Sequence, residues 1–312
     1  MGKGISSIIL IIIVIAAVAF LYFFGRGFIS PSTITYKNDI ITVEDFSVTA
    51  ENLFPGGTST ISFFIQNNGD KTARNTIVEF TDLHGMIPTK LECNMEEQDF
   101  TNGVKCDFGD LESLDNREVS LILTAQNVTE KEKFVVTYRI AYDYSGYKEA
   151  IIPIVDGVTV KKSPVQYKES SMSYGPIAVE FEPPVGGTRI EAGETIKEYW
   201  GVKGYPFSMT TKFKTVSSSY GGKTTPPVIK VGDLKMKLVG LDLDVPCIDR
   251  FIKTADDYYI YKRDLKIPTD SITCNYMPLD FSDPWTTANV ILNFSYNFEY
   301  FKTQSFTIQP LR

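Results

Sequence analysis

The sequence predicts an all-β body preceded by one N-terminal hydrophobic α-helix. Residues 5–24 read ISSIILIIIVIAAVAFLYFF and contain no charged residue, no proline and no glycine. The rest of the chain is rich in Thr, Val, Ile and aromatic residues, which favour strands. Turns rich in Gly, Pro, Asn and Asp recur about every ten residues. With 312 residues, the chain is long enough for two tandem β-sandwiches after the helix.

The hydrophobic helix is assigned to residues 1–26. As an α-helix, its apolar run would span about 30 Å, the thickness of the hydrocarbon core of a membrane. Lys3 precedes the run and Arg26 follows it. A cleaved secretory signal would have a shorter apolar core and a small-residue cleavage site, which this segment lacks. A membrane anchor and the stem of a filament subunit are the two interpretations that remain.

The junction before the apolar run resembles a known type of leader. Residues 3–9, Lys-Gly-Ile-Ser-Ser-Ile-Ile, are similar to the class III signal peptides of archaeal type IV pilins and archaellins. The resemblance implies cleavage between Gly4 and Ile5, followed by self-association of the helix in a filament core. Because the same apolar side chains suit lipid equally well, a plain membrane anchor stays open as the alternative.

A short stalk at residues 27–39 leads to the first predicted domain at 40–162. Ile61, Phe63 and Ile65 alternate with other side chains and therefore share one face of a strand. A later strand places four side chains on one face: Phe134, Val136, Tyr138 and Ile140. Strands of this length with no helical pattern between them indicate a β-sandwich.

Part of this domain resembles an immunoglobulin-like repeat. Ile65-Gln66-Asn67-Asn68-Gly69, then 73–78 (Ala-Arg-Asn-Thr-Ile-Val), then 104–111 (Val-Lys-Cys-Asp-Phe-Gly-Asp-Leu), are similar to the repeat of prokaryotic cell-adhesion and surface-layer-associated proteins. Asp115-Asn116 stands where that repeat usually has a glycine. The resemblance implies an immunoglobulin-like sandwich on a cell surface, and it transfers no catalytic residue.

A polar linker at residues 163–175 precedes the second predicted domain at 176–312. Its clearest strand covers 290–300, where apolar and polar side chains alternate. This alternation places Asn293 on the more polar face. The rhythm of the region indicates a second sandwich. The fold class expected for the whole chain is therefore all-β, with two tandem immunoglobulin-like β-sandwiches after one hydrophobic α-helix.

The four cysteines fall into two local pairs, Cys93 with Cys106 and Cys247 with Cys274. None belongs to a C-x-x-C motif, and with one histidine in the chain there is no zinc-binding set. We therefore expect one disulfide in each predicted domain, as is usual for exported proteins, with four buried thiols as the alternative.

Two further features agree with an exported body. Asn127 and Asn293 each begin an Asn-x-Ser/Thr sequon and are candidate glycosylation sites. The net charge of −7 is a poor match for nucleic acid or anionic lipid surfaces. We expect the membrane to be a partner of the helix only, with both sandwiches outside the cell, where surface or glycan partners are possible.

Candidate catalytic and metal-binding groups are sparse. Asp242 and Asp244 share one strand face near Asp256-Asp257, but they lack the spacing of a calcium loop and are interpreted as solvated carboxylates. His84 follows a strand without a matching nucleophile. Three Gly-Gly pairs, one of them at residues 186–187, are interpreted as turns and not as phosphate-binding loops. We therefore expect no enzyme activity, no cofactor and no metal.

The functional expectation is a structural protein of the cell surface. In the main hypothesis the chain is an archaeal type IV pilin-like filament subunit, with its helix in the filament core and its sandwiches facing outward. The alternative is a single-pass membrane-anchored adhesin or glycan-binding module.

Overall fold

The computed structural model describes residues 39–311 except for 158–164, 171–173, 192–193, 217–222 and 246. The predicted helix (1–26), the cleavage residues Gly4 and Ile5, and nearly all of the predicted stalk (27–39) therefore lie outside the described residues. The described chain is all-β, as predicted: it consists of strands β1 to β24 and one short 3-10 helix, Ile248–Arg250. In this part of the chain, no helix is both long and apolar enough to cross a membrane.

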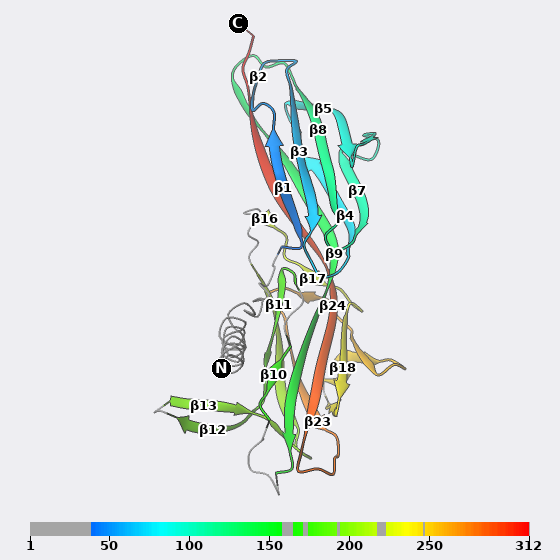
Figure 1. The fold of residues 1–312 in the computed structure, drawn as a ribbon, viewed down its shortest axis with the longest axis vertical. Helices are drawn as coiled ribbons and strands as arrows, with labels where there is room; N and C mark the ends of the chain where they lie inside the picture. The colour runs from blue at the N-terminus through cyan, green and yellow to red at the C-terminus, as the bar shows by residue number, and fades with distance from the viewer. Residues whose placement is uncertain are drawn as a thin grey trace, which may run out of the picture. The chain divides into compact units, whose positions relative to one another are not determined.

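Two very long strands organise the body. β9 (Glu132–Val155) and β24 (Trp285–Ile308) have 24 residues each and pair antiparallel along their whole length. At the usual rise per residue this ladder is about 80 Å long. Figure 1 shows the two strands running through the body, with different strands around each end. Everything between residues 156 and 284 is thus inserted in the connection between two neighbouring strands.

One half of the ladder contributes to the first sandwich. A five-stranded sheet, in the order β1-β3-β8-β5-β6, faces a sheet in which the ladder is extended by β4 and β7. Ring contacts cross between the sheets, because Phe63 lies 5.1 Å from Tyr138 and 6.3 Å from Phe80, measured between ring centroids. The strands are β1 (Ile41–Val48), β3 (Thr58–Asn67), β4 (Ala73–Thr81), β5 (Met86–Cys93), β6 (Glu96–Gln98), β7 (Lys105–Leu111) and β8 (Asn116–Ala125).

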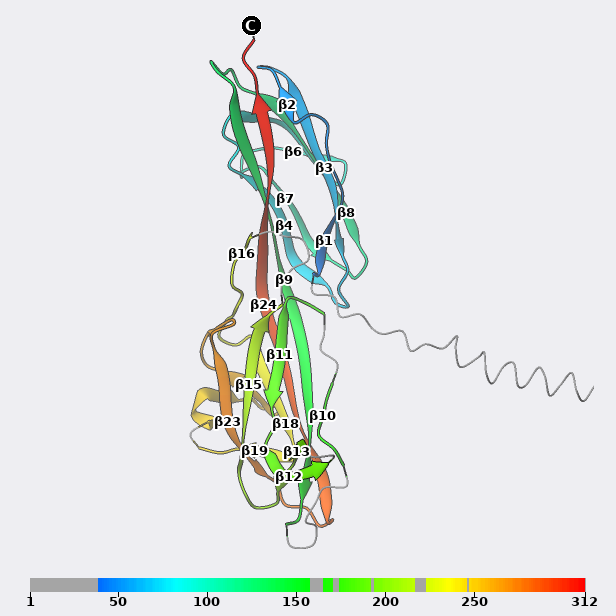
Figure 2. The ribbon, with the colours of Figure 1, turned by 90° about the vertical axis from the view of Figure 1, so that its left-hand side faces the viewer.

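The other half of the ladder contributes to the second sandwich. A four-stranded sheet, in the order β11-β15-β23-β19, faces the ladder and its extension by β18, β21 and β20. The rings of Phe213 and Phe294 meet edge to face between the two sheets at 5.9 Å. The strands are β11 (Ile177–Glu182), β15 (Phe207–Thr215), β18 (Leu234–Val239), β19 (Leu241–Leu243), β20 (Phe251–Lys253), β21 (Tyr258–Tyr261) and β23 (Ser271–Pro278). Figure 2 shows β15, β18 and β23 around this half of the ladder.

Short strands complete the pairing. Most of them add to the ladder or its neighbours, and β12 pairs with β13 in a separate two-stranded hairpin. The sequence analysis did not predict this hairpin, because it interprets Gly186 and Gly187 as a turn. In the structure both glycines lie in β12, and the Trp200 ring covers their backbone. These strands are β2 (Asn52–Leu53), β10 (Lys168–Glu169), β12 (Val185–Glu191), β13 (Glu194–Tyr199), β14 (Gly201–Val202), β16 (Lys223–Thr224), β17 (Val228–Ile229) and β22 (Leu265–Lys266).

The shared ladder connects the two regions that were expected to be separate domains. Residues 37–312 group into one compact unit, whereas the sequence was divided into separate domains at 40–162 and 176–312. The reason is the length of β24: its last residues, up to Ile308, pair with β9 and with β2 inside the first sandwich. The first sandwich is therefore completed by the end of the chain.

Alternation along β24 matches the prediction from the sequence. The six side chains expected on one face, from Val290 to Tyr300, are all buried, and none is more than 5 % exposed. Asn293 and its polar neighbours occupy the opposite face, where they are half-buried or exposed. This polar face of the ladder carries the candidate site described next.

Candidate functional site

A polar cleft lies on the outer face of the ladder near its middle. It encloses about 460 Å³ and is lined by residues of β4, β9, β17 and β24, of the turn before β4 and of the turn that follows β17. We call it the waist cleft. Its lining residues are Thr72, Arg74, Asn75, Asp143, Tyr144, Ser145, Val228, Lys230, Asp233, Ser295, Tyr296 and Asn297.

Strand register brings the central residues of the waist cleft into one row. Arg74 on β4 pairs with Asp143 on β9, Asp143 pairs with Asn297 on β24, and Asn297 pairs with Val228 on β17. A bulge in β4 between Arg74 and Ile77 shifts the register there. Such a bulge redirects side chains locally, so that Arg74 and Asn75 both reach the cleft.

Two amide groups hold the Asp143 carboxylate in place. Asn75 Nδ2 donates to Asp143 Oδ2 at 2.6 Å, and Asn297 Nδ2 donates to Asp143 Oδ1 at 3.1 Å. Asn75 has a backbone φ of +51°, a left-handed conformation that asparagine tolerates better than most residues. The carboxylate is thus held in place by two neutral donors.

Tyr144 joins the floor of the cleft to the turn before β4. Its hydroxyl donates to Asp70 Oδ1 at 2.7 Å and accepts the backbone N–H of Lys71 at 2.9 Å. Burial raises the pKa of this hydroxyl, and the hydrogen bond to Asp70 raises it further. The phenol therefore stays protonated at neutral pH, and its role is to hold the turn in position.

A second hollow of about 280 Å³ adjoins the waist cleft and shares Ser145, Asp233 and Ser295 with it. Lys71 and Lys235 line this second hollow, and Lys71 Nζ donates to the backbone oxygen of Ser145 at 3.4 Å. The two hollows together form a polar surface rich in basic side chains. Fixed charges, amides and hydroxyls in this arrangement suit the binding of a polar ligand.

Farther along the same face, Arg139 bridges three strands. Its Nη1 donates to Glu79 on β4 at 2.9 Å, and its Nε donates to Glu299 on β24 at 2.6 Å. Partial burial of Glu299 favours its neutral form, but hydrogen bonds from Thr225 and Arg139 outweigh this effect and lower its pKa. The carboxylate of Glu299 is therefore stabilised in the folded state.

We expect Glu299→Gln to cost about 1 kcal/mol of stability at neutral pH, as for other partly exposed ion pairs. A carboxyl group whose pKa is lowered by folding stabilises the protein above its unfolded-state pKa, about 4.3, and this contribution disappears as the pH falls through the folded-state value. Melting temperatures of both proteins between about pH 3 and 7 should therefore converge at the acidic end. A constant difference across this range would contradict the assignment.

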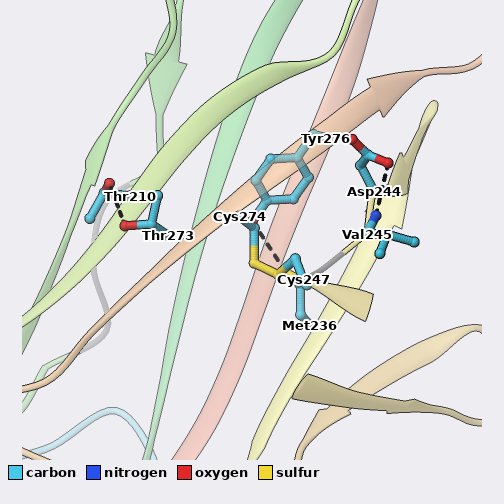
Figure 3. The surroundings of a disulfide bond; sticks show 8 residues. All are labelled: Thr210, Met236, Asp244, Val245, Cys247, Thr273, Cys274 and Tyr276. Atoms are coloured by element: carbon cyan, nitrogen blue, oxygen red, sulfur yellow. Dashed lines mark hydrogen bonds between the residues drawn. A yellow bond between two sulfur atoms is a disulfide. The ribbon is translucent and has the colours of Figure 1, made fainter. Parts of the chain in front are cut away.

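Both predicted disulfides are present. Cys93 on β5 bonds to Cys106 on β7, with a Cα–Cα distance of 5.6 Å, and Cys247 bonds to Cys274 on β23 at 5.3 Å. The first bond connects the two facing sheets of the first sandwich, since β5 belongs to the five-stranded sheet and β7 to the ladder sheet. The second bond attaches the loop after β19 to β23, its neighbour in the four-stranded sheet. Figure 3 shows the second bond beside Tyr276 and Met236.

We expect removal of either disulfide to destabilise the body. The chain-entropy model gives about 3 kcal/mol for Cys93→Ser/Cys106→Ser and about 3.5 kcal/mol for Cys247→Ser/Cys274→Ser, because the second loop is longer. Denaturant titrations of the oxidised protein and of each double variant would measure the losses. An unchanged midpoint on adding a reductant to the unmodified protein would show that the bonds contribute little.

The two predicted glycosylation residues differ in exposure and in the kind of element that carries them. Asn127 is exposed in the loop between β8 and β9. Asn293 is half-buried in the middle of β24, between Tyr147 on β9 and Lys235 on β18, and it lines the second hollow. Gly4 and Ile5 lie outside the described residues, so the structure brings none of the predicted site residues together except the cysteines.

Sequence reasoning missed the waist cleft. The dipeptide Arg74-Asn75 was interpreted only as part of a repeat signature, and Asp143 lies beyond the recognised strand. The available signal was the run of polar residues at alternate positions of β24, from Asn293 to Asn297. The partners of that run on other strands depend on register, which the alternation does not specify.

Comparisons with known proteins give no family for this chain. No family model matches the sequence, and no curated protein matches it. Among solved structures, domains D2 and D3 of the major pilin SpaD from Corynebacterium diphtheriae are similar over 78% of this chain and 77% of theirs, with 10% identity and a TM-score of 0.25.

Two further structures match shorter parts. AvmM, which catalyses macrocyclization in alchivemycin A biosynthesis, covers 44% of this chain and 90% of its own, with 13% identity and a TM-score of 0.25. The alkylpurine DNA glycosylase AlkC from Pseudomonas fluorescens covers 32% of this chain and 27% of its own, with 11% identity and a TM-score of 0.21. These likenesses carry no conclusion about the function of this chain.

Proposed function

We propose that the chain is a non-enzymatic structural protein of the cell surface, a pilin-like filament subunit whose N-terminal helix packs in the filament core. The observation that carries this proposal is the ladder of β9 and β24. Because both strands pass without interruption through both sandwiches, hydrogen-bonded backbone and not a flexible linker holds the two halves together. A continuous body of this kind is suited to bearing load or projecting from a surface.

The strand order supports an immunoglobulin-like first sandwich. In immunoglobulin domains, strands A, B, E and D form one sheet and strands G, F and C form the other. Here β1-β3-β8-β5 and β24-β9-β4 occupy the same orders. In this assignment β9 is strand F and β24 is strand G, so the second sandwich is an insertion between F and G. The end of the chain then supplies the last strand of the first sandwich.

The two disulfides support export from the cytosol. Such bonds persist in oxidising compartments and are rare where thiols are kept reduced. Together with the charge-free run at residues 5–24, they favour a body outside the cell with the hydrophobic segment in a membrane or a filament. The archaeal assignment and the cleaved leader come from the resemblance of residues 3–9 to class III signal peptides.

Intact mass of the native protein and microscopy of the source cells test this proposal together. We expect loss of Met1 to Gly4 from the native protein, retention of the leader after Gly4→Val, and normal processing of a Ser7→Ala control. Antibodies against the second sandwich should label filaments. An intact leader together with diffuse membrane labelling would refute the filament proposal.

A second candidate function is a membrane-anchored adhesin or glycan-binding module. The observation that favours it is the waist cleft, whose Arg74 and Lys230 form no ion pair with a carboxylate among the described residues. A purely structural subunit has no need of such a hollow. This candidate predicts monomers in detergent and a melting temperature that rises with added ligand. Filament labelling would count against it as the main function.

A further inference from the structure

We propose that the waist cleft binds an acidic saccharide, with Arg74 and Lys230 recognising its carboxylate and Asp143 accepting its hydroxyl groups. The proposal rests on the surface location in the proposed function, because an exported body meets the glycans of its own or a neighbouring surface. It does not require filament assembly.

Basic side chains line both hollows. Arg74 and Lys230 line the waist cleft, and Lys235 lines the adjoining hollow; in the described part of the chain, none of the three forms an ion pair with a carboxylate. Asp143 and Asp233 also line the waist cleft and balance its two basic residues, but Lys71 and Lys235 of the adjoining hollow bring the lining of both hollows to four basic and two acidic residues. This local excess of basic groups is opposite in sign to the net charge of −7 of the whole protein. Unpaired basic groups at the rim of a hollow favour an anionic ligand, and the arginine guanidinium suits a carboxylate because it donates two parallel hydrogen bonds.

The cleft also has groups that can bind the hydroxyl groups of a ligand. A carboxylate accepts about four hydrogen bonds, and Asp143 receives one from Asn75 and one from Asn297. Its remaining acceptor positions suit the hydroxyl groups of a sugar. Ser145 and Ser295 are paired across the ladder and add two hydroxyls to the lining. A volume of about 460 Å³ also lies in the range of small-ligand sites.

The lining of the cleft favours a saccharide over an acidic peptide. Protein partners usually insert aromatic or aliphatic anchors at the centre of an interface. The waist cleft offers little to receive them, because Tyr144 and Tyr296 are only 2% and 3% exposed and Val228 is the one aliphatic side chain of its lining. Strand addition is also blocked, since at Asp143 and Asn297 the strands β4, β9, β24 and β17 are already paired side by side. A polar ligand rich in hydroxyl groups fits this lining better.

Calorimetric titration of the full chain in detergent, with tri-galacturonic acid as the probe, tests the proposal. Maltotriose serves as a neutral saccharide of similar size, and hexaglutamate serves as an acidic peptide. We expect binding of tri-galacturonic acid only, weakening with added salt. Arg74→Gln should weaken it at least about ten-fold, as for loss of a charged hydrogen bond. Lys230→Gln should weaken it less.

Arg250→Gln is the matched control, because Arg250 is also exposed but lies outside the cleft lining, and it should leave binding unchanged. Equal melting temperatures of the three variants would show that they are folded alike. Failure of tri-galacturonic acid to bind at millimolar concentration, or equal binding of maltotriose, would overturn the proposal. Tighter binding of hexaglutamate with the same dependence on Arg74 would assign the cleft to a protein partner instead. A retained leader or absent filaments would refute the filament proposal and leave this result unaffected.

Discussion

Gly146→Val is expected to destabilise the body by about 3 kcal/mol, at the upper end of what overpacking usually costs. Gly146 lies in the middle of β9, directly opposite Phe294 on β24. A Cβ atom at this position would lie between 2.2 and 2.8 Å from carbon atoms of the Phe294 ring. The ring cannot easily move away, because it is only 2% exposed and packs against Phe213 and Tyr296. Chemical denaturation of the purified chain would measure the loss.

A double-mutant cycle tests the physical reason for this effect. Phe294→Leu shortens the obstructing side chain, so Gly146→Val should cost clearly less in that background than in the unmodified protein. Ser145→Val serves as the control, because Ser145 is the neighbouring residue on the opposite, half-buried face of the same strand. Additive losses for Gly146→Val and Phe294→Leu would show that the contact between these two residues is not the cause.

Phe63→Ala is expected to cost about 3 to 5 kcal/mol, the range for removing a large buried aromatic side chain. Phe63 is 1% exposed and lies on β3 of the five-stranded sheet. Its ring contacts Tyr138 and Phe80 on the facing sheet and Phe46 on its own sheet. The substitution therefore removes the side chain that joins the two sheets of the first sandwich. Thermal and denaturant melts would measure it.

The matched control is Phe46→Ala. Phe46 stacks on Phe63 and on Tyr138, with both pairs of ring centroids 5.9 Å apart, but it is 39% exposed. Its removal leaves no enclosed cavity, so we expect a loss of about 1 kcal/mol, close to the value of an aromatic pair alone. Equal losses for the two substitutions would contradict the view that Phe63 is the central side chain of this core.

Periodicity along single strands was predictable from the sequence. The alternation from Val290 to Tyr300 identified both the strand and its buried face, because one face of β24 lies on the core and the other on solvent. The disulfides followed from local spacing, since each pair of cysteines is separated by only 13 or 27 residues. The all-β class followed from composition and turn frequency.

The sequence did not predict in the same way which strands pair with each other. The strand that begins at Glu132 continues to Val155 through Asp143 and Gly146, residues that usually end a strand. Gly146 is tolerated because the Phe294 ring, which comes from far along the chain, covers its backbone. The sequence analysis assigned all of β9 to the first domain and all of β24 to the second, whereas the two strands pair with each other along their whole length.

The waist cleft was hidden for a similar reason. Arg74, Asp143 and Asn297 are far apart in the sequence and become neighbours only through the register of three strands. The bulge that directs Arg74 and Asn75 into the cleft depends on Asn75 adopting a positive φ, for which the sequence shows only that asparagine is permitted. The polar alternation in β24 indicated a solvated face but not a hollow.

Differential scanning calorimetry of the purified chain and two variants tests most directly the claim that the shared ladder makes both sandwiches one cooperative body. Phe63→Ala perturbs the first sandwich and Phe213→Ala the second, where Phe213 is 1% exposed. If the ladder couples the two halves, the body melts in a single transition, and each substitution moves that whole transition to lower temperature. Two separate transitions, each moved by only one of the substitutions, would contradict this account.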